Sequence, residues 1–176
     1  VIDPWGSAQS TDYDRIISQF GLASMEGVSV PSPSKLHRRG IVFAHRDVDQ
    51  VLEAQRTGSP FGVLTGLMPS GQMHLGHSMV VEQVKWFQQH GGDVTIAVAD
   101  LESQATRGIS LEKGRKVALE EYVAHYAALG LEPEKTEVYF QSTRPAVQRL
   151  GFQLGKRTNL SEFEAIYGFG GDTNLA

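Results

Sequence analysis

The chain has 176 residues, no cysteine and a formal net charge of −4. This length predicts one domain, or one domain and part of another. The lack of cysteine excludes disulfides and thiolate metal sites, and the acidic balance argues against a module that coats nucleic acid. No apolar run approaches the roughly 20 residues of a membrane span, and the polar amino terminus has no signal-peptide pattern, so we expect no membrane association and a cytoplasmic location.

The pattern of residues 1–58 predicts helices and loops. The segment from Asp12 to Gly21 predicts a short helix, with Asp12 as its N-cap and Gly21 at its end. Gly27 to Ser34 holds two prolines and three serines, which is typical of a loop. A further helix follows Asp47, a candidate cap, and its apolar stripe consists of Val48, Val51 and Leu52.

The rest of the chain alternates between strand and helix patterns. The predicted elements are a strand at Phe61–Thr65, a helix from about Leu75 to His90, a strand at Val94–Ala99, a long helix from about Ser110 to Gly130, a strand at Thr136–Gln141, and helices at about 145–156 and 160–168. The second strand is apolar throughout, which predicts burial on both faces. The alternation predicts an α/β fold, namely half of a Rossmann-like, doubly wound parallel sheet.

Ligands bind beyond the carboxyl ends of the strands in such sheets. We therefore expect the segments Leu64–His77, Asp100–Ser103 and Gln141–Arg144 to converge at one edge. Most of the candidate chemistry lies in the first segment, at the turn from the first strand into the first helix of the sheet unit.

That turn contains Thr65-Gly66, Pro69-Ser70-Gly71 and His74-Leu75-Gly76-His77. It matches neither the Walker A loop nor the Gly-x-Gly-x-x-Gly fingerprint. Its two histidines are expected in the first turn of the helix, facing one side. Unpaired amides at a helix start attract anions, and Gly76 leaves room for a flat ligand close to the backbone.

Two functional interpretations of the histidine pair compete. In the first, His74 and His77 bind a metal ion with Asp100 or Glu102 as a third ligand. In the second, imidazole N–H groups and the helix start stabilise the phosphates of a nucleotide during phosphoryl or nucleotidyl transfer. A third interpretation, that the histidines are incidental, is disfavoured by the strand, turn and helix around them.

The motif resembles the "HIGH" signature of class I aminoacyl-tRNA synthetases, and Thr65-Gly66 with Pro69-Ser70-Gly71 resembles the subclass that activates tryptophan or tyrosine. Other segments are similar in order and spacing to the archaeal and eukaryotic type of tryptophanyl-tRNA synthetase. These are Ile2-Asp3-Pro4-Trp5, Asp12-Tyr13-Asp14, Arg38-Arg39-Gly40-Ile41, His45-Arg46-Asp47, Gln50-Val51-Leu52 and Ile166-Tyr167-Gly168-Phe169. The resemblance covers nearly the whole chain.

The resemblance implies ATP-dependent formation of tryptophanyl-adenylate, assisted by Mg²⁺, and transfer of the tryptophanyl group to tRNA(Trp). It implies a homodimer and assigns catalysis to His74 and His77. The implied ATP-binding residues are Thr65, Gly66, Pro69, Ser70, His74, Gly76 and His77, and the implied substrate-binding residues are Leu64, Ala97, Glu102 and Gln141. Residues 1–58 would then form an N-terminal extension, and 59–176 a Rossmann-fold catalytic domain that is incomplete at its carboxyl end.

The sequence departs from the family pattern at several places. Leu64 and Ala97 stand where eukaryotic relatives tend to have Tyr and Gln, and Leu67 stands where an Arg is frequent. No Lys-Met-Ser-Lys-Ser-like loop occurs in these residues, so we expect this chain alone to be poorly active or inactive. The alternatives are a tyrosyl-tRNA synthetase, another nucleotidyltransferase with the same signature, and a non-catalytic fragment that keeps the nucleotide-binding fold.

Overall fold

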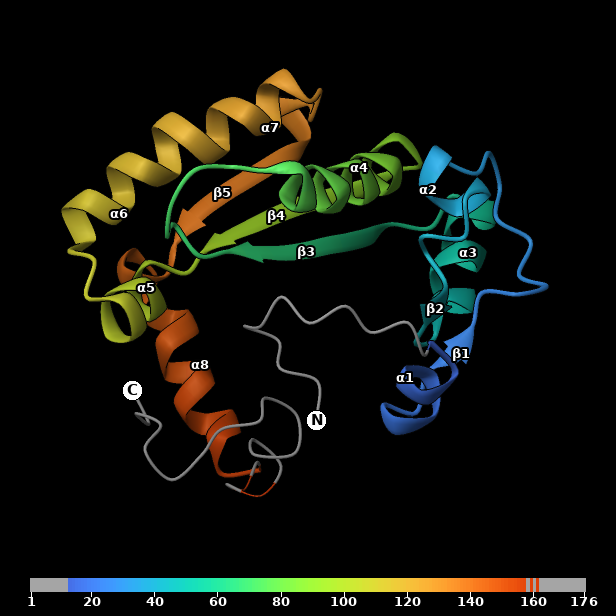
Figure 1. Ribbon diagram of the computed structural model, residues 1–176, viewed down its shortest axis with the longest axis horizontal. Coiled ribbons are helices and arrows are strands. Elements are labelled where there is room, and N and C mark those ends of the chain that lie inside the picture. The colour runs from blue at the N-terminus through green and yellow to red at the C-terminus, as the bar shows by residue number, and fades with distance from the viewer. Residues whose placement is uncertain (1–12, 158, 160, 162–176) are drawn as a thin grey trace.

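The computed structural model describes residues 13–157, 159 and 161 (Figure 1). Its elements are α1 (Tyr13–Gln19), β1 (Ala23–Ser24), α2 (Lys35–Arg38), β2 (Ala44–His45), α3 (Val48–Thr57), β3 (Phe61–Leu67), α4 (Leu75–Gln89), β4 (Gly92–Val98), α5 (Asp100–Arg107), α6 (Leu111–Val117), the π-helical segment η1 (Ala118–Val123), α7 (Ala124–Ala128), the 3-10 turns η2 (Pro133–Lys135) and η3 (Gln141–Thr143) around β5 (Thr136–Phe140), and α8 (Pro145–Gly155). The predicted cap Asp12, the Ile2–Trp5 and Ile166–Phe169 motifs, and most of the predicted helix at 160–168 lie outside the described residues.

The centre of the fold is a three-stranded parallel sheet in the order β3-β4-β5. The strands end in register, since Leu67 pairs with Val98 and Val98 with Phe140. Each crossover runs through helices, as parallel strands require. The predicted α/β unit is therefore confirmed. Strand β3 extends two residues beyond the predicted end at Thr65.

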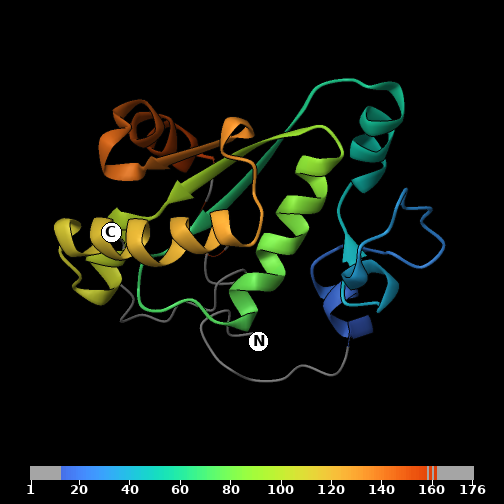
Figure 2. The same cartoon turned by 90° about the horizontal axis from the view of Figure 1, so that it is seen from above.

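The helices α4 and α6–α7 lie on the same side of the sheet (Figure 2). This follows from the strand order, because two right-handed crossovers that step in the same direction place their helices on one face. The covered face forms the core, with Val94, Ile96 and Val98 of β4 almost fully buried. The alternate residues Thr95 and Ala97 are only half-buried. The prediction that this strand is buried on both faces is wrong.

Three local predictions also differ from the structure. The segment after β4 folds as α5, a helix that its polar sequence did not indicate. The predicted long helix begins after Ser110, as expected, with the Ser110 hydroxyl accepting from the Lys113 amide, but η1 interrupts it. Asp47 precedes α3 as predicted, yet its side chain caps nothing. Instead, the Val48 amide donates to His45 Nδ1 at 3.3 Å.

The elements before β3 lie beyond the amino ends of the strands, at the opposite end of the sheet from α5 and α8 (Figure 1). They include a short antiparallel ladder between β1 and β2. The loop predicted at Gly27–Ser34 is confirmed, and Ser34 caps α2. Among the residues that the structure describes, none of the helices has the length and apolar character that a membrane crossing requires.

Trp86 of α4 packs against the elements before β3 and so connects them to the sheet unit. It is buried, donates from Nε1 to the Ser32 carbonyl at 2.9 Å, and packs against the tilted rings of His37 and His90. We expect Trp86→Ala to lower the free energy of unfolding by about 3–5 kcal/mol. Trp86→Phe should cost less, because the ring remains and one hydrogen bond worth about 1 kcal/mol is lost. Urea unfolding measures both, and equal stability of the alanine variant and the parent protein would contradict this packing.

Candidate active site

The three segments predicted to converge do meet at the carboxyl ends of the strands. The Ala99 amide donates to the Leu67 carbonyl at 2.7 Å, and the Ser103 hydroxyl donates to the Pro69 carbonyl at 3.4 Å. Asp100, which is buried, accepts from the Ser142 amide at 3.0 Å and from the Ser142 hydroxyl. Asp100 therefore joins the ends of β4 and β5 and is committed to structure, so it is not the metal ligand considered from the sequence.

The two signature histidines cap helix α4. His74 is the N-cap and His77 is the third helical residue, so only His77 lies within the first turn. The Gly76 amide donates to His74 Nδ1 at 3.2 Å, and the His74 amide donates to His77 Nδ1 at 3.2 Å. The expectation that these first amides are unpaired is therefore wrong for Gly76, whose donor the His74 ring satisfies.

These two bonds determine the protonation of the rings. A nitrogen that accepts a hydrogen bond carries no proton, so both neutral imidazoles carry theirs on Nε2. The rings lie together, with centroids 3.9 Å apart. The helix start thus presents a pair of Nε2–H donors, a suitable arrangement for binding phosphate oxygens.

Gly76 makes this arrangement possible for a different reason from the one we expected. A Cβ atom at this position would lie 3.0 Å from Cε1 and 3.1 Å from Nδ1 of His74, closer than ordinary contact. The His74 ring therefore occupies the space above Gly76 that the sequence reasoning gave to a flat ligand. The glycine is required by the histidine cap itself.

The other predicted ATP-binding residues differ in how far they are exposed to solvent. Ser70 and Gly66 are exposed, whereas Thr65 is half-buried on the covered side of β3. Pro69 is fully buried, and Gly114 of α6 lies beneath it. Pro69 therefore shapes the loop from inside, where a ligand does not reach. Leu67 is buried in the core, on the face of the sheet that α4 and α6–α7 cover.

Two predicted substrate-binding residues lie on the face of the sheet opposite α4 and α6–α7, which within the described residues is only partly covered. Leu64 is 73% exposed, and Ala97 pairs with Gly66 on the neighbouring strand. Tyr139 of β5 pairs with Ala97 and shares this face, with the Arg144 guanidinium 4.9 Å from its ring centroid. Sequence reasoning missed Tyr139, although the two-residue alternation of a third parallel strand would have placed it beside Ala97.

Glu102 and Gln141 follow the ends of β4 and β5. Glu102 lies in the first turn of α5 and is half-buried, and within the described residues its carboxylate has no hydrogen bond or ion pair. Gln141 begins η3, and its backbone carbonyl accepts from the Gln148 side chain at 2.9 Å. The structure brings both residues to the edge where the segments meet. Their contact with a substrate stays a prediction.

No group of three or more histidine and acidic side chains that could hold a metal ion occurs in the part of the chain that the structure describes. The histidine Nδ1 atoms are already engaged by backbone amides. The geometry therefore favours the phosphate-binding interpretation of the pair over a metal site built from it with Asp100.

Burial lowers the pKa of His77 below the usual 6.5, and nearby His74 lowers it further; burial and His90 act the same way on the pKa of His37. The unfolded chain then binds these protons more tightly than the folded chain. Their contribution to stability is complete above about pH 6.5 and decreases as the pH falls below it. We expect the urea concentration at the midpoint of unfolding to fall between about pH 7 and about pH 5.5. The fall should be smaller in a His37→Asn, His77→Asn double variant. An equal fall in both proteins would contradict the assignment of this pH dependence to the two histidines.

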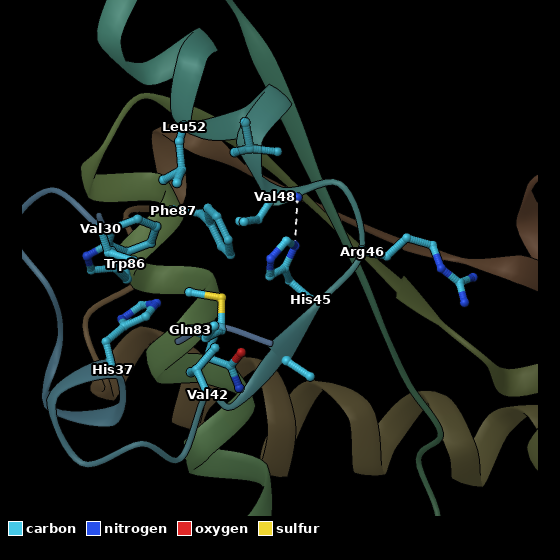
Figure 3. Close-up of a pocket in the computed structure, with 13 residues that line it drawn as sticks. Val30, His37, Val42, His45, Arg46, Val48, Leu52, Gln83, Trp86 and Phe87 are labelled. Atoms are coloured by element: carbon cyan, nitrogen blue, oxygen red, sulfur yellow. Dashed lines mark hydrogen bonds between the residues drawn. The ribbon is translucent and has the colours of Figure 1, made fainter. Parts of the chain in front are cut away.

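A separate pocket of about 240 Å³ lies between the amino-terminal elements and the later turns of α4 (Figure 3). Its lining includes the apolar side chains of Trp86, Phe87 and Leu52 and the imidazoles of His37 and His45. The α4 residues that line it begin at Gln83, six positions after His77. The pocket is thus distinct from the histidine cap.

Comparison with known proteins agrees with this fold. A profile of the family described as tRNA synthetases class I (W and Y) matches residues 56–176. The tryptophan–tRNA ligase of Methanosarcina acetivorans is 45% identical over 99% of this chain and 40% of its own length, and that of Thermoplasma acidophilum is 48% identical over 96% and 38%. The crystal structure of tryptophanyl-tRNA synthetase from Aeropyrum pernix K1 superposes with a TM-score of 0.80 at 43% identity, covering 96% of this chain and 48% of that one.

The parallel α/β unit, with the histidine signature at the start of α4, thus defines a protein with the fold of the class I synthetases. The profile match covers well over half of the sequence, and the chain belongs to the class I tRNA synthetase family of the tryptophan and tyrosine enzymes. The chain spans less than half the length of the curated relatives described above.

Proposed function

We propose that this chain carries the ATP- and tryptophan-binding part of a tryptophan–tRNA ligase. The observation that carries the proposal is the pair of imidazoles at the start of α4, each with its Nδ1 engaged by a backbone amide. The names of the relatives support tryptophan over tyrosine as the amino acid. The retained cap argues against the alternative of a fragment without catalytic residues.

In the proposed reaction, a carboxylate oxygen of tryptophan attacks the α-phosphorus of ATP. A bond forms between that oxygen and phosphorus, and the bond from phosphorus to the bridging oxygen of the β-phosphate breaks, releasing pyrophosphate. Negative charge grows on the phosphate oxygens, and the Nε2–H groups of His74 and His77 donate to them. A ribose hydroxyl at the 3′ end of the tRNA then attacks the carbonyl carbon of the adenylate. An ester bond forms between that carbon and the ribose oxygen, the bond from the carbon to the phosphate oxygen breaks, and AMP leaves while the hydroxyl proton is released.

The remaining site assignments are part of this proposal. Thr65, Gly66, Pro69, Ser70 and Gly76 shape the nucleotide loop. Leu64, Ala97, Glu102 and Gln141 form the amino-acid side, and the position of Tyr139 beside Ala97 adds it to that group. The proposed division is a 1–58 extension followed by a catalytic unit from 59 onward.

Several wider inferences follow from family membership. Mg²⁺ enters as the counter-ion of ATP and is treated as part of that substrate. The tRNA(Trp) partner, assembly as a homodimer and a cytoplasmic location are inferred in the same way. Activity measurements require a completed synthetase, by which we mean this chain joined to a downstream half, either its own or that of the Aeropyrum pernix enzyme.

Calorimetry with non-hydrolysable tryptophanyl- and tyrosyl-adenylate analogues tests the proposal. We expect the completed synthetase to bind the tryptophanyl analogue at least about tenfold more tightly, a difference of about 1.4 kcal/mol. Tighter binding of the tyrosyl analogue would contradict the tryptophan assignment. Binding of neither would contradict the proposed function altogether.

A second test concerns Glu102, whose carboxylate suits the amino group or indole N–H of tryptophan. We expect Glu102→Gln to raise the dissociation constant for tryptophan about 10- to 100-fold, since a hydrogen bond to a charged group contributes about 1.5–3 kcal/mol. Binding of ATP should be unaffected. Glu112, in the first turn of α6, provides the matched control Glu112→Gln. Unchanged tryptophan affinity in the Glu102 variant would mean that the pocket lies elsewhere.

A further inference from the structure

The helix that follows α5 contains an irregularity at its centre. Between α6 and α7, residues Ala118–Val123 form the π-helical segment η1. A π-helical turn accommodates one more residue than an α-helical turn and redirects the side chains around it, and such turns are frequent at functional sites. The large side chain that η1 buries most deeply is Tyr122, which is 1% exposed.

Tyr122 lies against the signature histidine. Its ring centroid is 5.3 Å from that of His77, and the two planes meet at 88°, an edge-to-face arrangement. On another side, His77 is packed by the His74 ring at 3.9 Å, and its Nδ1 accepts the His74 amide. Both rings and the backbone therefore constrain His77. Within the described residues, Nε2–H is the one polar group of its ring that has no partner.

The orientation of this ring needs such constraint. The outer torsion of a histidine side chain is broad, so the imidazole can turn about its bond to Cβ at little cost. A half-turn would move Nδ1 away from the His74 amide and redirect Nε2–H. The hydrogen bond from the His74 amide to this Nδ1 is 3.2 Å long and lies at an exposed residue, so it constrains the ring only weakly by itself. The buried tyrosine supplies a rigid surface on the core side.

We infer that Tyr122 is a positioning residue for His77: its ring, placed by the π-helical segment, holds the imidazole in the orientation that directs Nε2–H toward the bound nucleotide. This deepens the proposed function and rests on it for the identity of the nucleotide. Tyr122 acts through His77 and does not touch the reacting atoms. The contact predicts that the aromatic ring matters and that filling the same volume with an aliphatic side chain does not suffice.

The matched control is Tyr126, one helical turn further on in α7. It is also buried, and this burial, with a smaller contribution from nearby Tyr122, raises its pKa to about 12. Among the described aromatic contacts, it has none with His77. Tyr126→Leu therefore reproduces the loss of a core tyrosine without removing the ring that touches the histidine.

The first readout uses this chain as it stands. Multiple-bond ¹H–¹⁵N spectra report which imidazole nitrogen of His77 carries the proton, independently of activity. We expect a single Nε2–H form in the parent protein, in Tyr122→Phe and in Tyr126→Leu, and a mixture of both forms in Tyr122→Leu. Should the leucine variant not fold, Tyr122→Met replaces it, because the flexible thioether side chain fills core gaps. A single Nε2–H form in the folded aliphatic variant would overturn the inference, as would a mixture in Tyr126→Leu.

The second readout is the rate of adenylate formation in the completed synthetase. We expect Tyr122→Leu to lower kcat about 10- to 100-fold, as losses of orienting residues do, with the KM for tryptophan unchanged. An equal loss in Tyr126→Leu would reduce Tyr122 to a core residue and overturn the inference. The two proposals fail separately: an inactive parent synthetase contradicts the proposed function, whereas the proton position on His77 tests the tyrosine contact alone.

Discussion

Replacing His77 with asparagine will lower the rate of tryptophanyl-adenylate formation by about 10²- to 10³-fold, the usual cost of removing one donor that stabilises growing negative charge. The asparagine oxygen can take the place of Nδ1 and accept the His74 amide, so the cap of α4 remains. What the variant lacks is the donor at the Nε2 position. The loss should appear in kcat, with the dissociation constant for tryptophan within about twofold of the parent value, because the contact strengthens in the transition state.

His77→Gln is the complementary variant. The glutamine amide reaches the Nε2 position but leaves no acceptor at Nδ1, so this variant should recover part of the rate and lose cap stability of about 1 kcal/mol. Single-turnover measurements in the completed synthetase separate the chemical step from binding, and urea unfolding measures the cap. If the asparagine variant forms adenylate at the parent rate, His77 only caps the helix and its proposed catalytic role is wrong.

Gly76→Ala will separate activity from stability. The new Cβ must displace the His74 ring, which lies 3.0 Å from the position where that atom would be built. The ring belongs to an exposed residue and can move, so the fold is not disturbed. Alanine is also the better helix former, by up to about 1 kcal/mol. Moving the ring loses its hydrogen bond with the Gly76 amide, which costs about 1 kcal/mol and offsets this gain. We therefore expect a nearly unchanged melting temperature together with a loss of adenylate formation of about 10- to 100-fold, since a displacement near 1 Å at a catalytic group has effects of that size.

Gly151→Ala is the matched control for this prediction. Gly151 also lies within a helix, α8, and nothing is within 4 Å of where its Cβ would be. This variant gains the same helix propensity without touching a histidine, so its rate should equal that of the parent synthetase. Full activity in Gly76→Ala would show that the His74 ring does not need the position seen here.

Much of the architecture could be predicted because it follows from periodicity. The strand and helix patterns from Phe61 to Gln141 gave the βαβαβ order, and parallel strands bring their carboxyl ends together. The convergence of the β3–α4 turn, Asp100 and Ser142 is a consequence of that topology.

Other features could not be predicted because they depend on side-chain geometry or on what covers the sheet. The apolar run of β4 does not reveal that Ala97 faces the side of the sheet opposite α4 and α6–α7 and is only half-buried. Histidine is not among the usual capping residues, so the cap formed by His74 and His77 had no sequence signal. The π-helical segment is equally hidden, because one additional residue shifts the apolar spacing without removing it, and Tyr122 reaches His77 as a result.

The histidine cap gives the signature two roles in this chain. Each Nδ1 satisfies a backbone amide at the start of α4, and each Nε2–H remains for a ligand. The hydrogen bond that stabilises the helix start thus also selects the tautomer that the proposed chemistry needs. The sequence suggested an anion site made of imidazole N–H groups together with backbone amides, whereas the structure engages the Gly76 amide and leaves the imidazole Nε2–H groups as donors.

The measurement that tests the central claim most directly is amino-acid-dependent exchange of pyrophosphate into ATP by the completed synthetase, with tryptophan and tyrosine compared side by side. We predict exchange that depends on tryptophan and is reduced about 10²- to 10³-fold in His77→Asn. Exchange that depends on tyrosine, or exchange with tryptophan that is unaffected by His77→Asn, would contradict this prediction.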